Sequence, residues 1–295
     1  MTLTDRQQAG KILPTIEKFT PNQVKFAIGY LTFFGYLSSE QIQNIDKNTL
    51  ESVMNTFQRT FDIPLTGALD RCTYKVMKLP RCGCPDKLDK GNKQHVSFMR
   101  TAEIAAEKRD KWNKQGLTFS VKNYIPGKLT KKQQLNIFTK AFQEWDILCK
   151  LEIAYTKKLD EADIVISTGK GKPDQFDGRG GTLAWAYMPR GDDNQLYMQF
   201  DLDEIWIDST TERGILLSNV ACHEFGHLLG LSHSKRKGAL MAPYYNPFIA
   251  VPQADDDIKR IQKLYGTEGS VKQKLVQKQI QIELEHGQEL VVKCK

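Results

Sequence analysis

The sequence predicts an α+β protein in which a small three-helix unit precedes a larger domain of strands and helices. Apolar residues recur at helical spacing in the first part of the chain, over 22–37, 50–61 and from 70 onward. Strand-like alternation dominates the middle of the chain. Amphipathic patterns over 129–148 and 254–266 predict helices that cover the strands.

In the first unit the helix over 22–37 is justified by apolar residues three and four positions apart, which lie on one helix face. The residues 38–41 (SSEQ) open with a serine that can cap a following helix. The positions on the apolar face of the first helix are Val24, Ala27, Ile28, Leu31 and Phe34.

The second part begins with a strand pattern over 111–126, where Leu117, Phe119 and Val121 alternate with polar residues. Between the two parts, residues 87–111 are polar and charged, which is typical of a mobile surface segment. Further strands are predicted over 151–156, 162–168, 182–188 and 196–201.

Length and composition limit the classes of function. A chain of 295 residues suggests two domains or one large one. The net charge of +7 is spread along the chain with no nucleic-acid motif, so nucleic acid is not an expected partner. No apolar run is long enough to span a membrane, and the first residues lack the apolar core of a secretory signal. The tail over 270–295 alternates around His286-Gly287, so a hairpin is one interpretation.

The most informative stretch is VACHEFGHLLGLSH, where His223, Glu224, His227 and His233 follow the pattern H-E-x-x-H-x-x-G-x-x-H. Two histidines four apart lie on one helix face and can bind one Zn²⁺. Glu224 is placed to act on a zinc-bound water. Gly230 lets the backbone turn so that His233 becomes the third ligand. Three protein ligands leave a position for water, which is typical of catalytic zinc.

A cysteine loop precedes the second part. In PRCGCPD, over 80–86, prolines and a glycine exclude regular helix and present Cys82 outward. Its thiolate could fill the open zinc position and silence the site. The alternative is a loop cysteine, disulfide-bonded to Cys84 or Cys72. The six cysteines, which do not form a dense disulfide framework, are Cys72, Cys82, Cys84, Cys149, Cys222 and Cys294.

The downstream ALMAPYY, with Met241, extends the zinc motif to the metzincin pattern. Together with YLTFFGYL, FQRTFDIPLTGALD and PRCGCPD, the chain resembles a zymogen of the matrixin family. The resemblance implies a peptidoglycan-binding-like propeptide over 1–109, a catalytic domain over 110–267 and a short tail over 268–295, without a hemopexin domain. It implies a twisted, mostly parallel five-stranded sheet with three helices, and secretion despite the missing signal.

The resemblance also assigns roles to residues of the Cys82 loop (residues 80–86). Cys82 becomes the inhibitory zinc ligand, and Arg81 and Asp86 brace the loop with an ion pair. Cys84 departs from the family, which usually has an apolar residue there, so a competing thiol or a redox-sensitive switch is one interpretation. In the second part, Met241 is expected to support the floor below the metal.

One family metal site is expected to be missing. The family's structural zinc has three histidines and an aspartate, and this chain has Lys170, Lys172, Trp185 and Gln199 there. Lysine repels a dication and tryptophan cannot ligate, so we expect one zinc for each chain. Calcium is expected, because hard oxygen ligands survive, although a solvated acidic turn is the alternative. Those ligands are Asp177, Gly178, Gly180, Thr182, Asp201 and Glu204.

Substrate features follow from the same resemblance. Leu183 and Ala184 lie on the edge strand, whose backbone pairs antiparallel with an extended peptide. Pro243 and Tyr245 line the pocket for the residue after the cut. Asn219 lies on the floor of that pocket, where a polar residue is unusual and could make it shallower or wetter. The alternative is that Asn219 merely caps or packs near the helix start.

The sequence therefore predicts a latent zinc endopeptidase in which Glu224 assists attack of zinc-bound water on extended proteins, including extracellular matrix components. Proteinaceous metalloprotease inhibitors are expected partners, and the chain is expected to be a monomer. The first alternative is a catalytically idle matrixin-like protein that binds peptides or matrix through its cleft. A second is metal storage or sensing through Cys82 and the histidines.

Overall fold

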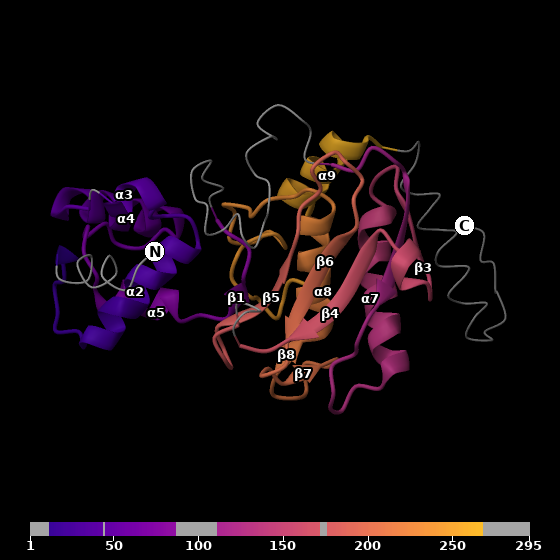
Figure 1. Ribbon diagram of the computed structural model, residues 1–295, viewed down its shortest axis with the longest axis horizontal. Helices are drawn as coiled ribbons and strands as arrows, with labels where there is room; N and C mark the ends of the chain where they lie inside the picture. The colour runs from indigo at the N-terminus through magenta and orange to yellow at the C-terminus, as the bar shows by residue number, and fades with distance from the viewer. Residues whose placement is uncertain (1–11, 44, 87–110, 172–175, 268–295) are drawn as a thin grey trace, which may run out of the picture.

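The computed structural model describes residues 12–43, 45–86, 111–171 and 176–267. In the first part, helices gather into one unit around an apolar core that includes Leu31 and Phe57 (Figure 1). Thr20 caps the helix that begins at Pro21, and Asp46 caps the helix that begins at Lys47. Each side chain accepts a hydrogen bond from the backbone N–H group three residues further along the chain. The helices are α2 (Pro21–Phe33), α3 (Ser39–Gln43), α4 (Lys47–Thr60) and α5 (Arg71–Met77).

The three predicted helices are present as α2, α4 and α5, and α3 is an additional short helix. Ser38 caps α3, because its hydroxyl accepts from the backbone N–H of Gln41. Among the described residues, no helix is both long and apolar enough to cross a bilayer.

The second part is built on a six-stranded sheet with the order β1-β5-β6-β4-β2-β3. Every neighbouring pair is parallel except β5 and β6. The sheet exceeds the predicted five strands because β1, from the Cys82 loop, adds to the edge strand β5. Its strands are β1 (Arg81–Cys82), β2 (Gly116–Val121), β3 (Glu152–Tyr155), β4 (Ile164–Gly169), β5 (Thr182–Ala186) and β6 (Leu196–Asp201).

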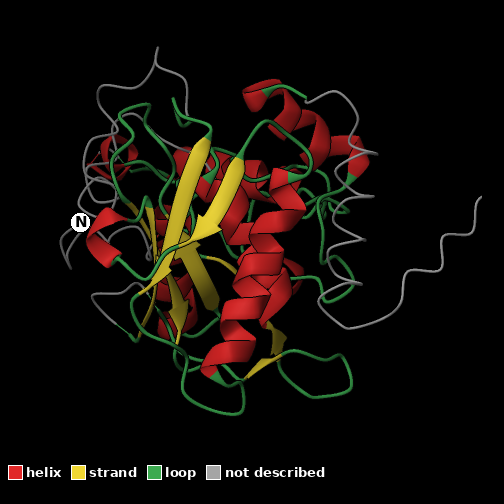
Figure 2. Cartoon of the chain, turned by 90° about the vertical axis from the view of Figure 1, so that its right-hand side faces the viewer, coloured by secondary structure: helices red, strands yellow, loops and turns green. Residues whose placement is uncertain are grey.

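Helices α7 (Lys131–Asp146) and α8 (Leu217–Leu228) pack on one face of this sheet, as Figure 2 shows, and they enclose the main core. In that core the rings of Phe142 on α7 and Phe225 on α8 stack with centroids 3.5 Å apart. The helix predicted over 254–266 is present as a helical segment formed by a π-turn, η2 (Ala254–Ile258), and α9 (Lys259–Tyr265). The predicted fold class is confirmed.

Shorter elements complete the described part of the chain. A small parallel pair, which the sequence did not predict, precedes α8 and directs the chain into it. The strands of this pair are β7 (Trp206–Ile207) and β8 (Ile215–Leu216), and a separate short helix is η1 (Leu159–Glu161).

Candidate functional site

The three histidines of the zinc motif converge at the end of α8. His223 and His227 lie one turn apart on the helix, with ring centroids 5.0 Å apart. Gly230 has φ +96°, a left-handed conformation that favours glycine, and it turns the chain out of the helix. The ring of His233 then returns to lie 4.8 Å from that of His227 and 5.4 Å from that of His223.

Each ring is oriented by a hydrogen bond from Nδ1. His223 Nδ1 lies 2.7 Å from the carbonyl of Leu240, and His227 Nδ1 lies 2.7 Å from that of Leu231. Carbonyl oxygens only accept, so both Nδ1 atoms carry the proton and both Nε2 atoms present a lone pair. Within the described residues, the buried Nε2 of His223 has no hydrogen-bond partner. Such an unpaired buried nitrogen is suited to a metal.

Cys82 completes a four-ligand group. Its Sγ lies 3.4 Å from Nε2 of His227, and one donor atom from Cys82 and each of the three histidines all lie within 4.8 Å of one another. A tetrahedral zinc with ordinary bond lengths separates its nitrogen and sulfur ligands by about 3.5 Å. The four side chains therefore fit a zinc ion.

Burial fixes the protonation states of this group. It lowers the pKa of His223 to about 3 and that of His227 well below its ordinary value. Both imidazoles are therefore neutral, which is the form that ligates metal. Burial also raises the pKa of the Cys82 thiol well above its ordinary value, and a bound cation would be needed to hold the thiolate.

The Cys82 loop lies in a slot between two segments of the second part. On one side, the N–H groups of Arg81 and Gly83 donate to the carbonyls of Gly181 and Ala184, at 3.0 and 2.7 Å. On the other side, the N–H of Cys82 donates to the carbonyl of Pro243 at 2.9 Å. The loop thus occupies the edge of β5 that was predicted for an extended peptide.

Glu224 is fully buried beside the Cys82 loop. Burial raises its pKa to about 8, against the lowering effect of hydrogen bonds from Cys82 and Cys84. The sulfur of Cys84 lies 3.9 Å from Oε2 of Glu224 and 3.3 Å from the carbonyl oxygen of Ala186. Cys84 therefore reaches the carboxylate that was predicted to be catalytic. Among the described residues, neither cysteine of the loop forms a disulfide, and Cys72 is an exposed thiol.

The predicted ion pair between Arg81 and Asp86 is present, with Nη2 and Oδ1 2.5 Å apart and both side chains buried. Tyrosines that the sequence analysis did not single out surround it. Arg81 donates to the hydroxyl of Tyr30 at 2.5 Å, and the hydroxyl of Tyr36 donates to Asp86 at 2.9 Å. The hydroxyl of Tyr30 also lies 2.9 Å from that of Tyr244, which links the helical unit to the second part.

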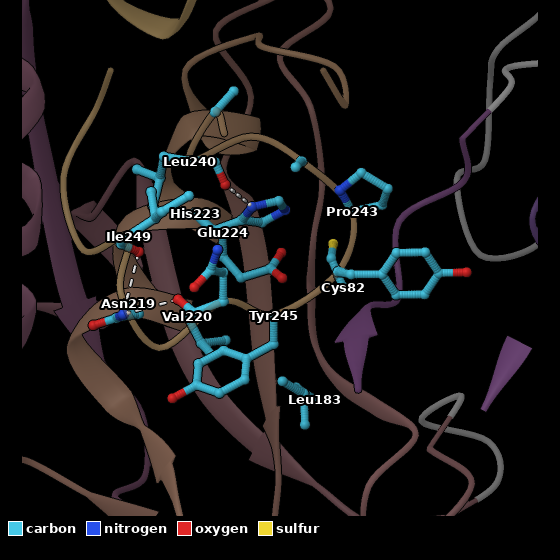
Figure 3. Close-up of a pocket in the computed structure, with 14 residues that line it drawn as sticks. Cys82, Leu183, Asn219, Val220, His223, Glu224, Leu240, Pro243, Tyr245 and Ile249 are labelled. Carbon is cyan, nitrogen blue, oxygen red and sulfur yellow. Dashed lines mark hydrogen bonds between the residues drawn. The ribbon is translucent and has the colours of Figure 1, made fainter. Parts of the chain in front are cut away.

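A cavity of about 30 Å³ opens beside Glu224, and Leu183, Pro243 and Tyr245 line it (Figure 3). Pro243 and Tyr245 were predicted to line the substrate pocket, whereas Leu183 was predicted only on the edge strand. Asn219 also lines this cavity. Its Nδ2 lies 3.1 to 3.3 Å from three carbonyl oxygens of the segment that closes the cavity. Asn219 does not cap α8, whose N-cap is Leu216 without a side-chain bond. The carbonyls belong to Asn246, Pro247 and Ile249.

Met241 is fully buried, and its side chain lies beside Gly226 of α8. A Cβ on Gly226 of α8 would lie 2.3 Å from Sδ of Met241 and 2.9 Å from Cζ2 of Trp145, so this close approach requires glycine. Asp257, which the sequence analysis did not single out, fixes the turn because its carboxylate accepts from the N–H groups of Leu240 and Met241 at 2.7 and 3.1 Å.

Hydrogen bonds link several of the predicted calcium ligands. Thr182 N–H donates to Asp177 at 2.8 Å, and Gly180 N–H donates to Glu204. The buried Oδ2 of Asp201 has no hydrogen-bond partner among the described residues. Burial, with the charges of Asp203 and Asp177, raises the pKa of Asp201 to about 6. An unpaired buried carboxylate oxygen among other carboxylates fits a calcium ion. Gly178 lies in the same loop with φ +91°.

The residues at the positions of the family's structural zinc make other interactions in this structure. Lys170 forms an ion pair with Asp203 at 2.6 Å. Trp185 packs with Phe176 and the two loop cysteines in a small apolar cluster. The Oε1 atom of Gln199 is buried without a hydrogen-bond partner in the described part of the chain.

Several predictions concern other residues. Cys222 is buried, as expected for an inert thiol, and its sulfur donates to the carbonyl of Ala141 at 3.7 Å. The predictions for Lys172, the linker over 87–110, Cys294 and the tail over 268–295 lie outside the described residues.

Comparison with protein-family models matches residues 111–266, more than half of the chain, to Peptidase M10, the matrixin family. Human matrix metalloproteinase-15 is 37% identical over 262 residues, which cover 82% of this chain and 38% of that protein. Rat macrophage metalloelastase is 36% identical over 258 residues, which cover 83% and 51%. Metalloendoproteinase 1-MMP of Arabidopsis thaliana is 33% identical over 253 residues, covering 80% and 67%.

The chain thus spans 38% to 67% of the length of these relatives. The matches agree with a zinc-binding histidine motif on a helix under a mostly parallel sheet. The chain belongs to the matrixin family.

Proposed function

We propose that the chain is a zinc endopeptidase that is made latent by its own Cys82 loop. The convergence of Cys82 with His223, His227 and His233 within 4.8 Å carries this proposal. The neutral imidazoles of His223 and His227 support it, and so does the buried carboxyl group of Glu224 beside them. The Nε2 atoms of His223 and His233 also have no hydrogen-bond partner among the described residues. A site for metal storage alone would have no use for that carboxylate or for the neighbouring edge strand.

In the mechanism that we propose, zinc would be held by the three histidines and would polarise the scissile carbonyl and acidify a water. Glu224 accepts a proton from the attacking water and returns it to the leaving amine. The edge of β5 aligns the peptide through main-chain hydrogen bonds, as Ala184 now does with the Cys82 loop. Met241 stabilises the floor of the site.

The Cys82 loop would block both the alignment of the peptide on β5 and the position of the attacking water. Its main chain occupies the edge of β5, and its Cys82 sulfur takes the position that the attacking water needs. Thiol modification or removal of the propeptide would release both. One zinc for each chain is expected, because Lys170 and Trp185 stand where the family's second zinc is bound, and calcium would occupy the loop of Asp177 and Asp201.

Extended proteins, including extracellular matrix components, are the proposed substrates, and secretion is the proposed destination. One relative is named a matrix metalloproteinase and another a macrophage metalloelastase. Their names support this class of substrate for the present chain. Proteinaceous metalloprotease inhibitors are proposed partners of the released site, and the proposed state is a monomer.

The decisive test separates an enzyme from a peptide-binding protein. The chain, after thiol modification with an organomercurial, is incubated with a broad fluorogenic peptide and compared with the Glu224→Ala variant. The proposal expects cleavage by the first and a loss of about 100-fold or more in the second, with zinc content unchanged. Equal cleavage would show that Glu224 has no catalytic role. Absence of cleavage in both, with peptide binding retained, would favour the idle binding protein.

A further inference from the structure

The three histidines differ in where Nδ1 finds its partner. His223 and His227 donate to carbonyls of Leu240 and Leu231, both at 2.7 Å and both within the part of the chain that carries the histidines. His233 instead donates to Oδ1 of Asp86 at 2.9 Å. Asp86 lies in the Cys82 loop, 147 residues earlier in the chain. One of the three candidate ligands is therefore oriented from the proposed propeptide.

Asp86 is firmly held for this contact. The guanidinium of Arg81 lies 2.5 and 3.2 Å from its two oxygens, and the hydroxyl of Tyr36 donates to Oδ2 at 2.9 Å. The side chains of Asp86 and His233 are both only 5% exposed. The buried guanidinium of Arg81 forms an ion pair with this carboxyl group, and an opposite charge at that distance favours the ionised form.

A charged acceptor makes His233 a better ligand than a neutral one would. An ionised carboxylate has no proton to donate and can only accept a hydrogen bond. Nδ1 of His233 therefore carries the proton, and Nε2 presents its lone pair. Hydrogen bonds to ionised groups are roughly twice as strong as those between neutral groups. A carboxylate on the far nitrogen raises the basicity of a ligating imidazole and fixes its ring. The buried Nε2 of His233 has no other partner among the described residues.

We propose that Asp86 is a positioning residue for zinc, supplied by the propeptide, so that the latent chain binds its metal more tightly than the released enzyme does. This inference rests on the proposed function. Release of the Cys82 loop would remove the Cys82 sulfur and, independently, the acceptor of His233. His223 and His227 would keep their carbonyl partners. The chain would thus bind zinc most tightly while the enzyme is latent.

The competing view is that Asp86 serves only as the partner of Arg81 and touches His233 without effect on the metal. The two views differ in one measurable quantity, the zinc affinity of a full-length chain in which Cys82 does not ligate. We would therefore work in a Cys82→Ser background, so that loss of the thiolate does not dominate the comparison.

In this background, Asp86→Ala, Asp86→Asn and Tyr36→Phe are each titrated with zinc against a colorimetric chelator. Tyr36→Phe is the matched control, because it removes a contact to Oδ2 of Asp86 and leaves Oδ1 to His233. Thermal unfolding of the metal-free chains reports whether each variant folds. Asp86→Asn keeps the shape of the side chain and an acceptor oxygen, and it carries the test if Asp86→Ala does not fold.

The proposal expects zinc affinity to fall about 10- to 100-fold in Asp86→Ala, and less in Asp86→Asn. Tyr36→Phe is expected to stay close to the parent. Folded Asp86 variants that bind zinc as tightly as the parent would overturn this inference and leave the proposed function intact. A parent that binds no zinc would overturn both.

Discussion

The sulfur of Cys84 lies 3.9 Å from Oε2 of Glu224, so the Cys82 loop reaches the proposed catalytic carboxylate with a second thiol. The same sulfur lies 3.3 and 3.4 Å from the carbonyl oxygen and the amide nitrogen of Ala186 on β5. Cys82, in contrast, points to the histidines. The two thiols nevertheless lie close together, because one atom from each of Cys82, Cys84, Glu224 and His227 lies within 4.8 Å of the others.

We predict that Cys82→Ser abolishes latency and that Cys84→Ser retains it. Only Cys82 lies in the group with all three histidines, while Cys84 belongs to a group that contains one of them, His227. The measurement is cleavage of a fluorogenic peptide by each full-length variant without thiol modification. Activity in Cys82→Ser alone supports the assignment. Activity released by Cys84→Ser instead would show that Cys84, and not Cys82, is the inhibitory thiol.

Calcium binding is predicted to depend on pH through Asp201. Its pKa in the calcium-free fold is about 6, above the ordinary value near 4. The folded chain therefore binds more protons than the unfolded chain between about pH 4 and 6, and its calcium-free stability falls as pH rises through this range. Calcium replaces those protons, so it should raise the melting temperature more at pH 7.5 than at pH 5.

Thermal unfolding with calcium or with a chelator, at both pH values, measures this difference. Asp201→Asn is the control and should remove most of the calcium response. An equal calcium shift at both pH values would mean that Asp201 does not take part.

Asn219 is predicted to limit the depth of the cavity beside Glu224. Its amide holds the segment that ends at Ile249 through carbonyl oxygens. Asn219→Ala removes these hydrogen bonds to partly buried carbonyls, at a cost of about 1 kcal/mol. The segment should loosen, and cleavage should shift towards peptides with longer side chains after the cut. Ser218→Ala is the control, because the hydroxyl of Ser218 donates to the side-chain oxygen of Asn219 and leaves its Nδ2 donor in place.

The comparison uses the ratio of kcat/KM for peptides with a long and a short side chain after the cut. An unchanged ratio in Asn219→Ala would leave Asn219 as a purely structural residue.

Gly226 is predicted to be intolerant of a larger side chain. A Cβ there would displace Met241 and meet the rigid ring of Trp145 at 2.9 Å. Overpacking of this kind costs about 1–3 kcal/mol. Gly226→Ala should lower the free energy of unfolding by that amount, as measured in urea. Gly29, whose added Cβ meets nothing within 4 Å, offers a control in α2. A Gly226→Ala chain as stable as Gly29→Ala would contradict the packing argument.

Local patterns predicted much of the fold. The spacing of apolar residues located α2, α4, α5 and α7, because amphipathic helices carry their periodicity in the sequence. The strand formed by Arg81 and Cys82 was not predicted, because it is set by pairing with β5 and has no alternation of its own. The pair β7–β8 is equally short, and each strand has only two residues.

The candidate site divides in the same way. His223, Glu224 and His227 are visible because a helix fixes their relation within one turn. The contact between His233 and Asp86 spans 147 residues, and no local spacing could reveal it. Asp257 and Tyr244 were likewise missed, because their roles depend on tertiary packing. Cys84 was singled out only as a departure from the family, and its proximity to Glu224 needed the fold.

The most direct measurement of the central claim is zinc content together with peptide cleavage, before and after thiol modification of the full chain with an organomercurial. The account predicts one zinc for each chain, no cleavage before treatment and cleavage after it. Two tightly held zinc ions would contradict the expectation of a single metal. One zinc and continued silence, even after removal of the segment that precedes the second part, would contradict the claim that this chain is a latent enzyme.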